Sequence, residues 1–191
     1  IIMAAYKNEE FKDVLNDAEL LTADGIGVVY ASRILGKPIQ ERAAGYDISC
    51  EVLERIKGTS RSVFLFGGKP GVADIAEEKL KERFCGLQIA GKRNGYFKPE
   101  EEESIVDEIN ASGADLLFVC LGAPKQELWI DKYKDKLNVK VAMGVGGSLD
   151  VFAGTVLRAP DFYCKHGLEW LYRLMKQPSR AGRMLALPKF G

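Results

Sequence analysis

Short apolar runs alternate with amphipathic segments along the middle of this chain. Four runs have few polar residues, and we predict strands there: residues 62–66, 86–90, 114–121 and 139–143. Three other segments place apolar residues at helical spacing: residues 70–84, 100–111 and 125–136. Strands that are apolar throughout are typical of a parallel sheet covered on both faces, and parallel strands need helical crossovers. The pattern predicts an α/β fold that is Rossmann-like and doubly wound, with a mainly parallel sheet.

The two ends of the chain are expected to be less regular. Residues 4–15 and 26–35 have helical spacing, and a short strand is expected at residues 20–23. We predict an α/β domain over residues 1–157 and a basic, amphipathic helical appendage over residues 158–191. The chain begins with isoleucine and its first methionine is Met3, so we expect further residues upstream.

Charge divides unevenly between these two parts. The whole chain has 27 basic and 27 acidic residues, whereas residues 158–191 contain seven basic and two acidic ones. A neutral total is not typical of a nucleic-acid-binding protein, which usually has a basic excess. A basic tail indicates an anionic partner of its own. The amphipathic pattern around Trp170 suits a membrane interface, and equally a helix that packs on the domain or on another subunit.

Two further classes of protein are excluded by what the sequence lacks. The lone histidine is His166, and the four cysteines are far apart: Cys50, Cys85, Cys120 and Cys164. This spacing forms no zinc site, and scattered cysteines in apolar surroundings are typical of free thiols in a reducing compartment. No apolar run approaches the ~20 residues of a membrane-spanning helix.

Glycine-rich segments follow several predicted strands. The residues that we take as candidates for substrate binding there are Gly67, Gly68, Gly122, Pro124, Lys125, Gly144, Gly146 and Gly147. Ligands of open α/β sheets bind outside the carboxyl ends of the strands. Glycine lets backbone N–H groups approach an anion, and a following helix start adds partial positive charge. The segments therefore indicate a phosphate-bearing ligand, although each alone is also compatible with a plain tight turn.

The standard nucleotide motifs are absent. The chain contains neither G-x-G-x-x-G with its distant acidic residue nor G-x-x-x-x-G-K-[ST], and no G-x-S-x-G elbow. The sequence thus indicates a phosphate ligand without the usual NAD, ATP or serine-hydrolase signature.

Three polar residues are the strongest candidates for the chemistry. Asp24 follows an apolar run and precedes Gly25, so its carboxylate can take a proton from a hydroxyl, or else cap the next helix. Gln126 begins a predicted helix, where it can bond a sugar or phosphate or simply be solvated. Arg42 lies in a predicted loop and can pair with a phosphate, or be a plain surface arginine.

The motifs, taken in order, resemble those of the WecG/TagA/CpsF glycosyltransferases (glycosyltransferase family 26). They run from Thr22-Ala23-Asp24-Gly25 through Arg42-Ala43-Ala44-Gly45 and Gly122-Ala123-Pro124-Lys125-Gln126-Glu127 to Gly167-Leu168-Glu169-Trp170. The resemblance covers essentially the whole chain. It implies transfer of N-acetylmannosamine from a UDP-sugar donor to polyprenyl-diphosphate-linked GlcNAc, with a β-1,4 linkage, inversion and no metal or other cofactor. The reaction belongs to wall teichoic acid synthesis.

The resemblance also implies roles for individual residues. Asp24 matches the general base and Gln126 a second active-site residue, while tail arginines are expected near the donor diphosphate: Arg173, Arg180 and Arg183. It implies a cytoplasmic protein that docks on the inner face of the cell membrane through its tail and forms homo-oligomers in solution. Three alternatives stay open at this point: another donor such as ManNAcA or glucose, a nucleotide-dependent oxidoreductase, and a non-catalytic nucleotide-binding module.

Overall fold

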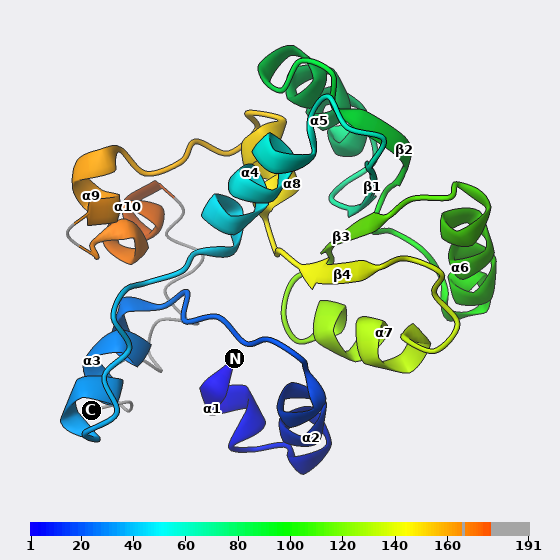
Figure 1. Cartoon of the computed structure of the whole chain (residues 1–191). Helices are drawn as coiled ribbons and strands as arrows, with labels where there is room; N and C mark the ends of the chain where they lie inside the picture. The colour runs from blue at the N-terminus through cyan, green and yellow to red at the C-terminus, as the bar shows by residue number, and fades with distance from the viewer. Residues whose placement is uncertain (166, 177–191) are drawn as a thin grey trace. The chain divides into compact units, whose positions relative to one another are not determined.

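The structure is a computed structural model that describes residues 1–165 and 167–176 (Figure 1). Contacts within the chain divide it into two compact units. The first consists of Ile1, Met3–Glu19 and Gly45–Val156, and the second of Ile2, Leu20–Ala44 and the chain from Leu157 onward. The domain boundary predicted after residue 157 stays a prediction.

The first unit contains a four-stranded parallel sheet in the order β2-β1-β3-β4 (Figure 1). The strands are β1 Ser62–Gly67, β2 Gln88–Arg93, β3 Leu116–Cys120 and β4 Val141–Gly144. β1 lies between β2 and β3, so that Val63 pairs with Ile89 on one side and with Leu116 on the other. All four predicted strands are present, and the predicted doubly wound α/β fold is confirmed.

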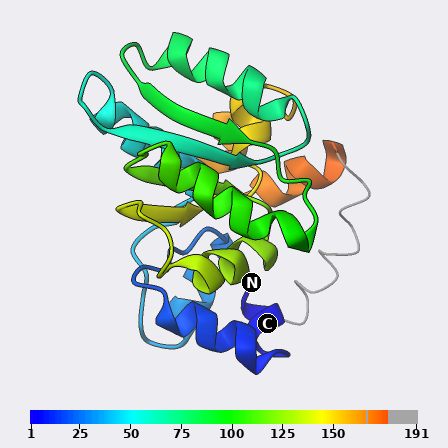
Figure 2. The same ribbon diagram turned by 90° about the vertical axis from the view of Figure 1, so that its right-hand side faces the viewer.

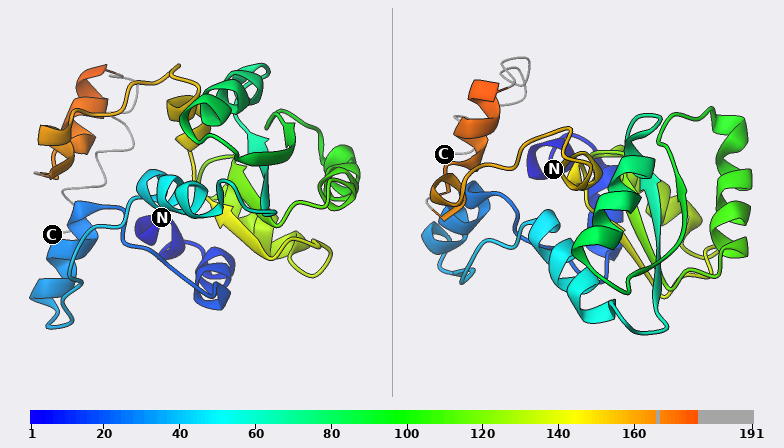
Figure 3. Two further views of the ribbon diagram at one scale, coloured as in Figure 1. Left: turned by 45° about the horizontal axis from the view of Figure 1, so that its top comes forward. Right: turned by 90° about the horizontal axis from the view of Figure 1, so that it is seen from above.

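Helices cover both faces of this sheet (Figures 2 and 3). One face packs against α4 Gly45–Ile56, α5 Val72–Arg83 and α8 Ser148–Phe152; the other packs against α6 Glu102–Ala111, preceded by the short 3₁₀ turn η1 Pro99–Glu101, and α7 Lys125–Tyr133. Successive residues of β1 alternate between the two cores: Val63 and Leu65 face the first, and Phe64 and Phe66 the second. Because both faces are buried, polar and apolar residues do not alternate along this strand.

Two helices of this unit were not expected from the sequence. α4 begins at Gly45 in a stretch assigned to a loop, and the short α8 follows the Gly144–Gly147 turn. Glycine and serine weaken the local preference for helix in α4. Tertiary packing of α4 compensates for this weak preference, because Leu53 is fully buried in the core. The Ser49 hydroxyl also donates to the Gly45 carbonyl at 2.7 Å.

The N-terminal helix predicted over residues 4–15 is two helices, α1 Ile2–Ala5 and α2 Glu9–Asp17. Asn8 interrupts it by capping α2, since its side-chain oxygen accepts a hydrogen bond from the Phe11 N–H at 3.1 Å. Phe11 of α2 is buried in a small cluster that packs against Leu128 of α7.

The second unit contains α3 Ile26–Ile34, α9 Asp161–Lys165 and α10 Glu169–Lys176. The strand predicted at residues 20–23 is wrong. Leu20 and Leu21 are exposed, residues 20–23 have no strand assignment, and the Ala23 carbonyl accepts from the Ala43 N–H at 3.0 Å. An apolar run becomes a strand only where a neighbouring strand pairs with it. Among the described helices, none is long and apolar enough to cross a membrane.

Asp115 joins the amino ends of three strands. Its carboxylate accepts hydrogen bonds from Lys140 Nζ at 2.6 Å, from Arg61 Nη1 at 2.7 Å and from the Ser62 N–H at 3.0 Å. Its own N–H donates to the Ser62 carbonyl at 3.1 Å. The bonds from Lys140 and Arg61 hold the pKa of Asp115 well below its usual range.

We predict that Asp115→Asn lowers the urea midpoint of unfolding at neutral pH. Because the folded-state pKa is depressed, the stabilisation by the charged carboxylate is complete above the unfolded-state pKa of about 3.9 and is lost as pH falls through the folded-state value. The midpoints of the variant and the parent should therefore converge in acid. Asp107→Asn, on the exposed face of α6, is the control. A difference that stays constant down to about pH 3 contradicts this account.

Candidate functional site

The order of the strands reverses at the carboxyl ends of β1 and β3, which is where the ligand crevice of this fold class lies. The chain proceeds from β1 to β2 on one side and from β3 to β4 on the other, so the two central neighbours mark the point where the order reverses. Gly67 ends β1 and is followed by Gly68, while Cys120 ends β3 and Gly122 follows two residues later. Three predicted binding residues therefore lie where a ligand of this fold class is expected.

The backbones of β1 and β3 approach each other closely at this crevice. A Cβ on Gly67, whose φ is +134°, would lie 2.3 Å from the Cys120 carbonyl oxygen. The Gly68 N–H donates to that same oxygen at 3.2 Å, and the Gly68 carbonyl accepts from the Gly95 N–H at 2.9 Å. Glycine is required at position 67 because no side chain fits. Burial raises the pKa of the Cys120 thiol to about 12, so this cysteine is neutral and does not act as a nucleophile.

Gln126 ties the end of β4 to the start of α7. Its side chain is buried, Oε1 accepts from the Gly146 N–H at 2.9 Å, and Nε2 donates to Glu127 Oε1 at 2.9 Å. A Cβ on Gly144 would lie 2.9 Å from Nε2, so the amide lies directly over that glycine. The interpretation of Gln126 as a solvated helix-start residue is wrong. In this structure its amide positions the Gly144–Gly147 turn.

Glu127 is a further partner of this turn, and no role was predicted for it from the sequence. One carboxylate oxygen orients the Gln126 amide, and the other is buried with no hydrogen-bond partner among the described residues. The only sequence signal was its place beside Gln126. Next to it, Lys125 is exposed, and its Nζ lies 4.0 Å from the centroid of the Phe97 ring. Pro124 precedes α7 after a cis peptide bond.

Asp24 and Arg42 belong to the second unit. The N-cap position of α3 is occupied by Gly25, so the interpretation of Asp24 as the N-cap residue is wrong. Arg42 Nη1 donates to Glu169 Oε2 at 2.7 Å, with only 15% of the arginine side chain and 10% of the glutamate side chain exposed. The interpretation of Arg42 as a plain surface arginine is therefore also wrong.

The charges of this second group act on one another. Burial by itself would lower the pKa of Arg42, but the hydrogen bond and charge of Glu169, together with the charge of Asp24, raise it above its usual value. Arg42 is therefore a permanent cation between two carboxylates. Glu169 was not singled out from the sequence, although an acidic residue in a basic tail was a signal.

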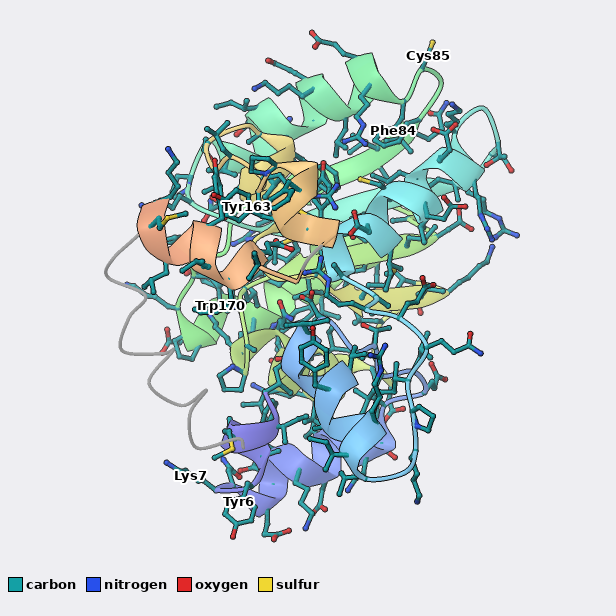
Figure 4. All side chains as sticks on the ribbon, turned by 90° about the vertical axis from the view of Figure 1, so that its left-hand side faces the viewer. Tyr6, Lys7, Phe84, Cys85, Tyr163 and Trp170 are labelled. Atoms are coloured by element: carbon teal, nitrogen blue, oxygen red, sulfur yellow. The ribbon has the colours of Figure 1, made fainter. Side chains whose placement is uncertain are left out.

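The remaining candidates lie in the tail. Arg173 is in α10, but its side chain, like the whole of Arg180 and Arg183, is outside the described residues. Figure 4 shows α9 and α10 with their aromatic side chains Tyr163 and Trp170. The Tyr163 ring packs against that of Tyr172 at 5.3 Å between centroids. The described candidates thus form two groups, one in each unit.

We predict that Gly67→Ala destabilises the protein by about 2–5 kcal/mol, because a Cβ there collides with the Cys120 carbonyl and the backbone is left-handed. Gly122→Ala is the matched control. Its φ is +78° but a Cβ there meets nothing within 4 Å, so it should cost only about 1–2 kcal/mol. Urea denaturation measures both values. Equal losses for the two variants contradict the close approach as the cause.

Comparison with known proteins identifies the family of this chain. The chain matches the glycosyl transferase WecG/TagA/CpsF family over residues 1–191. It is 43% identical over 186 residues to N-acetylglucosaminyldiphosphoundecaprenol N-acetyl-beta-D-mannosaminyltransferase of Bacillus spizizenii, covering 97% of this chain and 72% of that protein. It is 37% identical over 190 residues to the protein of the same name from Bacillus subtilis, covering 100% and 73%. The expected resemblance is confirmed: the chain belongs to the WecG/TagA/CpsF family of glycosyltransferases.

Proposed function

We propose that this glycosyltransferase moves N-acetylmannosamine from UDP-ManNAc to the GlcNAc of GlcNAc-diphospho-undecaprenol, forming the β-1,4 linkage of the wall teichoic acid linkage unit. The observation that carries the proposal is the name shared by the two relatives, which states both the sugar transferred and the lipid acceptor. Both relatives are similar to this chain over nearly all of its length. The family match leaves the oxidoreductase alternative without support, and the relatives' names favour N-acetylmannosamine over other donor sugars.

The proposed step is a direct displacement. The Asp24 carboxylate takes the proton of the acceptor 4-hydroxyl while that oxygen attacks the anomeric carbon of the donor. The bond from the acceptor oxygen to this carbon forms as the bond to the diphosphate breaks, the configuration inverts, and UDP leaves with the electron pair. Positive side chains stabilise the charge that develops on UDP, in place of a metal: Arg42 and the tail residues Arg173, Arg180 and Arg183.

Two structural observations support these roles. The charge of Asp24 acts on Arg42. The glycines after β1 and β3 lie at the crevice where the phosphates of a nucleotide bind in sheets of this kind.

We predict that Asp24→Asn lowers kcat by about 10²- to 10⁴-fold, because the amide cannot accept the proton, while UDP still binds. Release of UDP with a lipid-diphosphate acceptor analogue measures turnover, and calorimetry measures UDP binding. Glu41→Gln, an exposed acid beside Arg42, should keep kcat within about twofold. Full turnover in the Asp24→Asn protein contradicts the assignment of the base.

We further propose that residues 158–191 dock a cytoplasmic, homo-oligomeric protein on the anionic inner face of the membrane. The basic excess of this segment supports an anionic surface. Its described helices expose large apolar side chains: Phe162 on α9, and Trp170 and Met175 on α10. Exposed apolar side chains combined with basic charge are typical of interfacial helices.

Replacing Phe162, Trp170 and Met175 together with serine should weaken binding to vesicles that contain anionic lipid by about tenfold or more. Cosedimentation measures the binding to vesicles. A higher salt concentration should weaken the binding of the parent protein to these vesicles. Ile75→Ser on α5 removes a comparably exposed apolar side chain and is the control. If vesicle binding persists and the oligomeric state changes instead, the apolar side chains serve contacts between subunits.

A further inference from the structure

We propose that Glu169 is a positioning residue for the transfer: its carboxylate holds the Arg42 guanidinium beside the segment that carries Asp24. The inference rests on the proposed function and extends it to a tail residue for which no role was predicted from the sequence. Glu169 opens α10. It does not touch substrate in this proposal, and it acts only through Arg42.

Three contacts bring together segments that are far apart in the sequence, all within the second unit. Arg42 Nη1 donates to Glu169 Oε2 at 2.7 Å. The next residue, Ala43, donates its N–H to the carbonyl of Ala23 at 3.0 Å, so the Arg42 segment runs beside the residue before Asp24. Gly167 packs so closely on α3 that a Cβ there would lie 2.7 Å from Ile26 Cγ1. The start of α10 is thus built into the surroundings of Asp24.

The Arg42–Glu169 ion pair is more buried than the ion pairs on the surfaces of the helices. The Arg42 and Glu169 side chains are 15% and 10% exposed, whereas those of the Arg55–Glu51 pair in α4 are 76% and 61% exposed. Exposed pairs contribute little, because water and salt screen them. Loss of one partner from a buried pair leaves the other charge without compensation, and the side chain must move to find it.

Charges from several segments act on Arg42. A guanidinium has five N–H donors in a planar fork, so one arginine can bond more than one anion. The titratable groups that act on Arg42 include Asp24 before α3, Cys164 in α9 and Glu169 in α10. The negative charge of Glu169 offsets part of the positive charge that Arg42 exerts on Asp24.

The test compares Glu169→Gln and Glu169→Asp in the full chain, with Glu51→Gln as the matched control. Glu169→Gln should lower kcat by about 10- to 100-fold and move the acidic limb of the kcat profile to lower pH, because loss of a nearby negative charge favours the charged form of the Asp24 carboxylate. Glu169→Asp keeps the charge but is shorter, so kcat should fall with the limb near its original position. Glu51→Gln should change neither quantity.

A second measurement tests the positioning role of Glu169 and does not depend on enzymatic activity. Titration of the Asp24 carboxyl, followed by ¹³C NMR, should have a lower midpoint in Glu169→Gln than in the parent and in Glu51→Gln. An unchanged midpoint, or an unshifted acidic limb together with reduced kcat, overturns the positioning role. If Glu169→Gln does not fold, Glu169→Asp decides, and full kcat in that variant overturns the proposal. Absence of UDP release by the parent would contradict the proposed function and leave the titration as the deciding result.

Discussion

The packing of β1 against β3 is the constraint on which the first unit depends. Both strands are buried on both faces, and their carboxyl ends approach until Gly67 lies against the Cys120 carbonyl. Such a contact allows no side chain on the β1 side of the crevice. The same close approach therefore explains why β1 ends on a glycine, Gly67, at the edge of the sheet where a diphosphate is expected.

At the neighbouring strand β4, the Gln126 side chain fixes the backbone of the turn. The Gly144–Gly147 turn at the end of β4 contains three glycines and has little conformational preference of its own. The buried amide supplies that preference by accepting from Gly146 and lying over Gly144, and Glu127 in turn orients the amide. A residue that appears from the motif to be a ligand contact is, in the structure, an anchor for the backbone that would make the contact. The two roles are compatible, because positioning a turn precedes binding by it.

The apolar runs were enough to predict the sheet, since β1 and β3 are buried throughout and no other element reads as a continuous apolar run of that length. The glycines at the crevice were predictable for the same reason. The incorrect predictions of helices and strands have a common cause. Where the local sequence preference is weak, tertiary contacts decide which secondary structure forms. Residues 20–23 are apolar but have no strand to pair with, and α4 forms in a glycine-rich stretch because Leu53 enters the core. The Arg42–Glu169 pair joins residues 127 positions apart, which no local pattern reports.

That pair also changes how the basic tail is understood. A tail that needed only to meet an anionic surface would have no use for a buried glutamate, because a buried carboxylate without a cation is costly. Glu169 instead binds the start of α10 to the Arg42 segment by charge, while Trp170, the next residue, is turned outward and 40% exposed. One short helix thus presents its acidic residue inward and apolar side chains outward. The contact that fixes the start of α10 to the Arg42 segment therefore also sets part of the charge around Asp24.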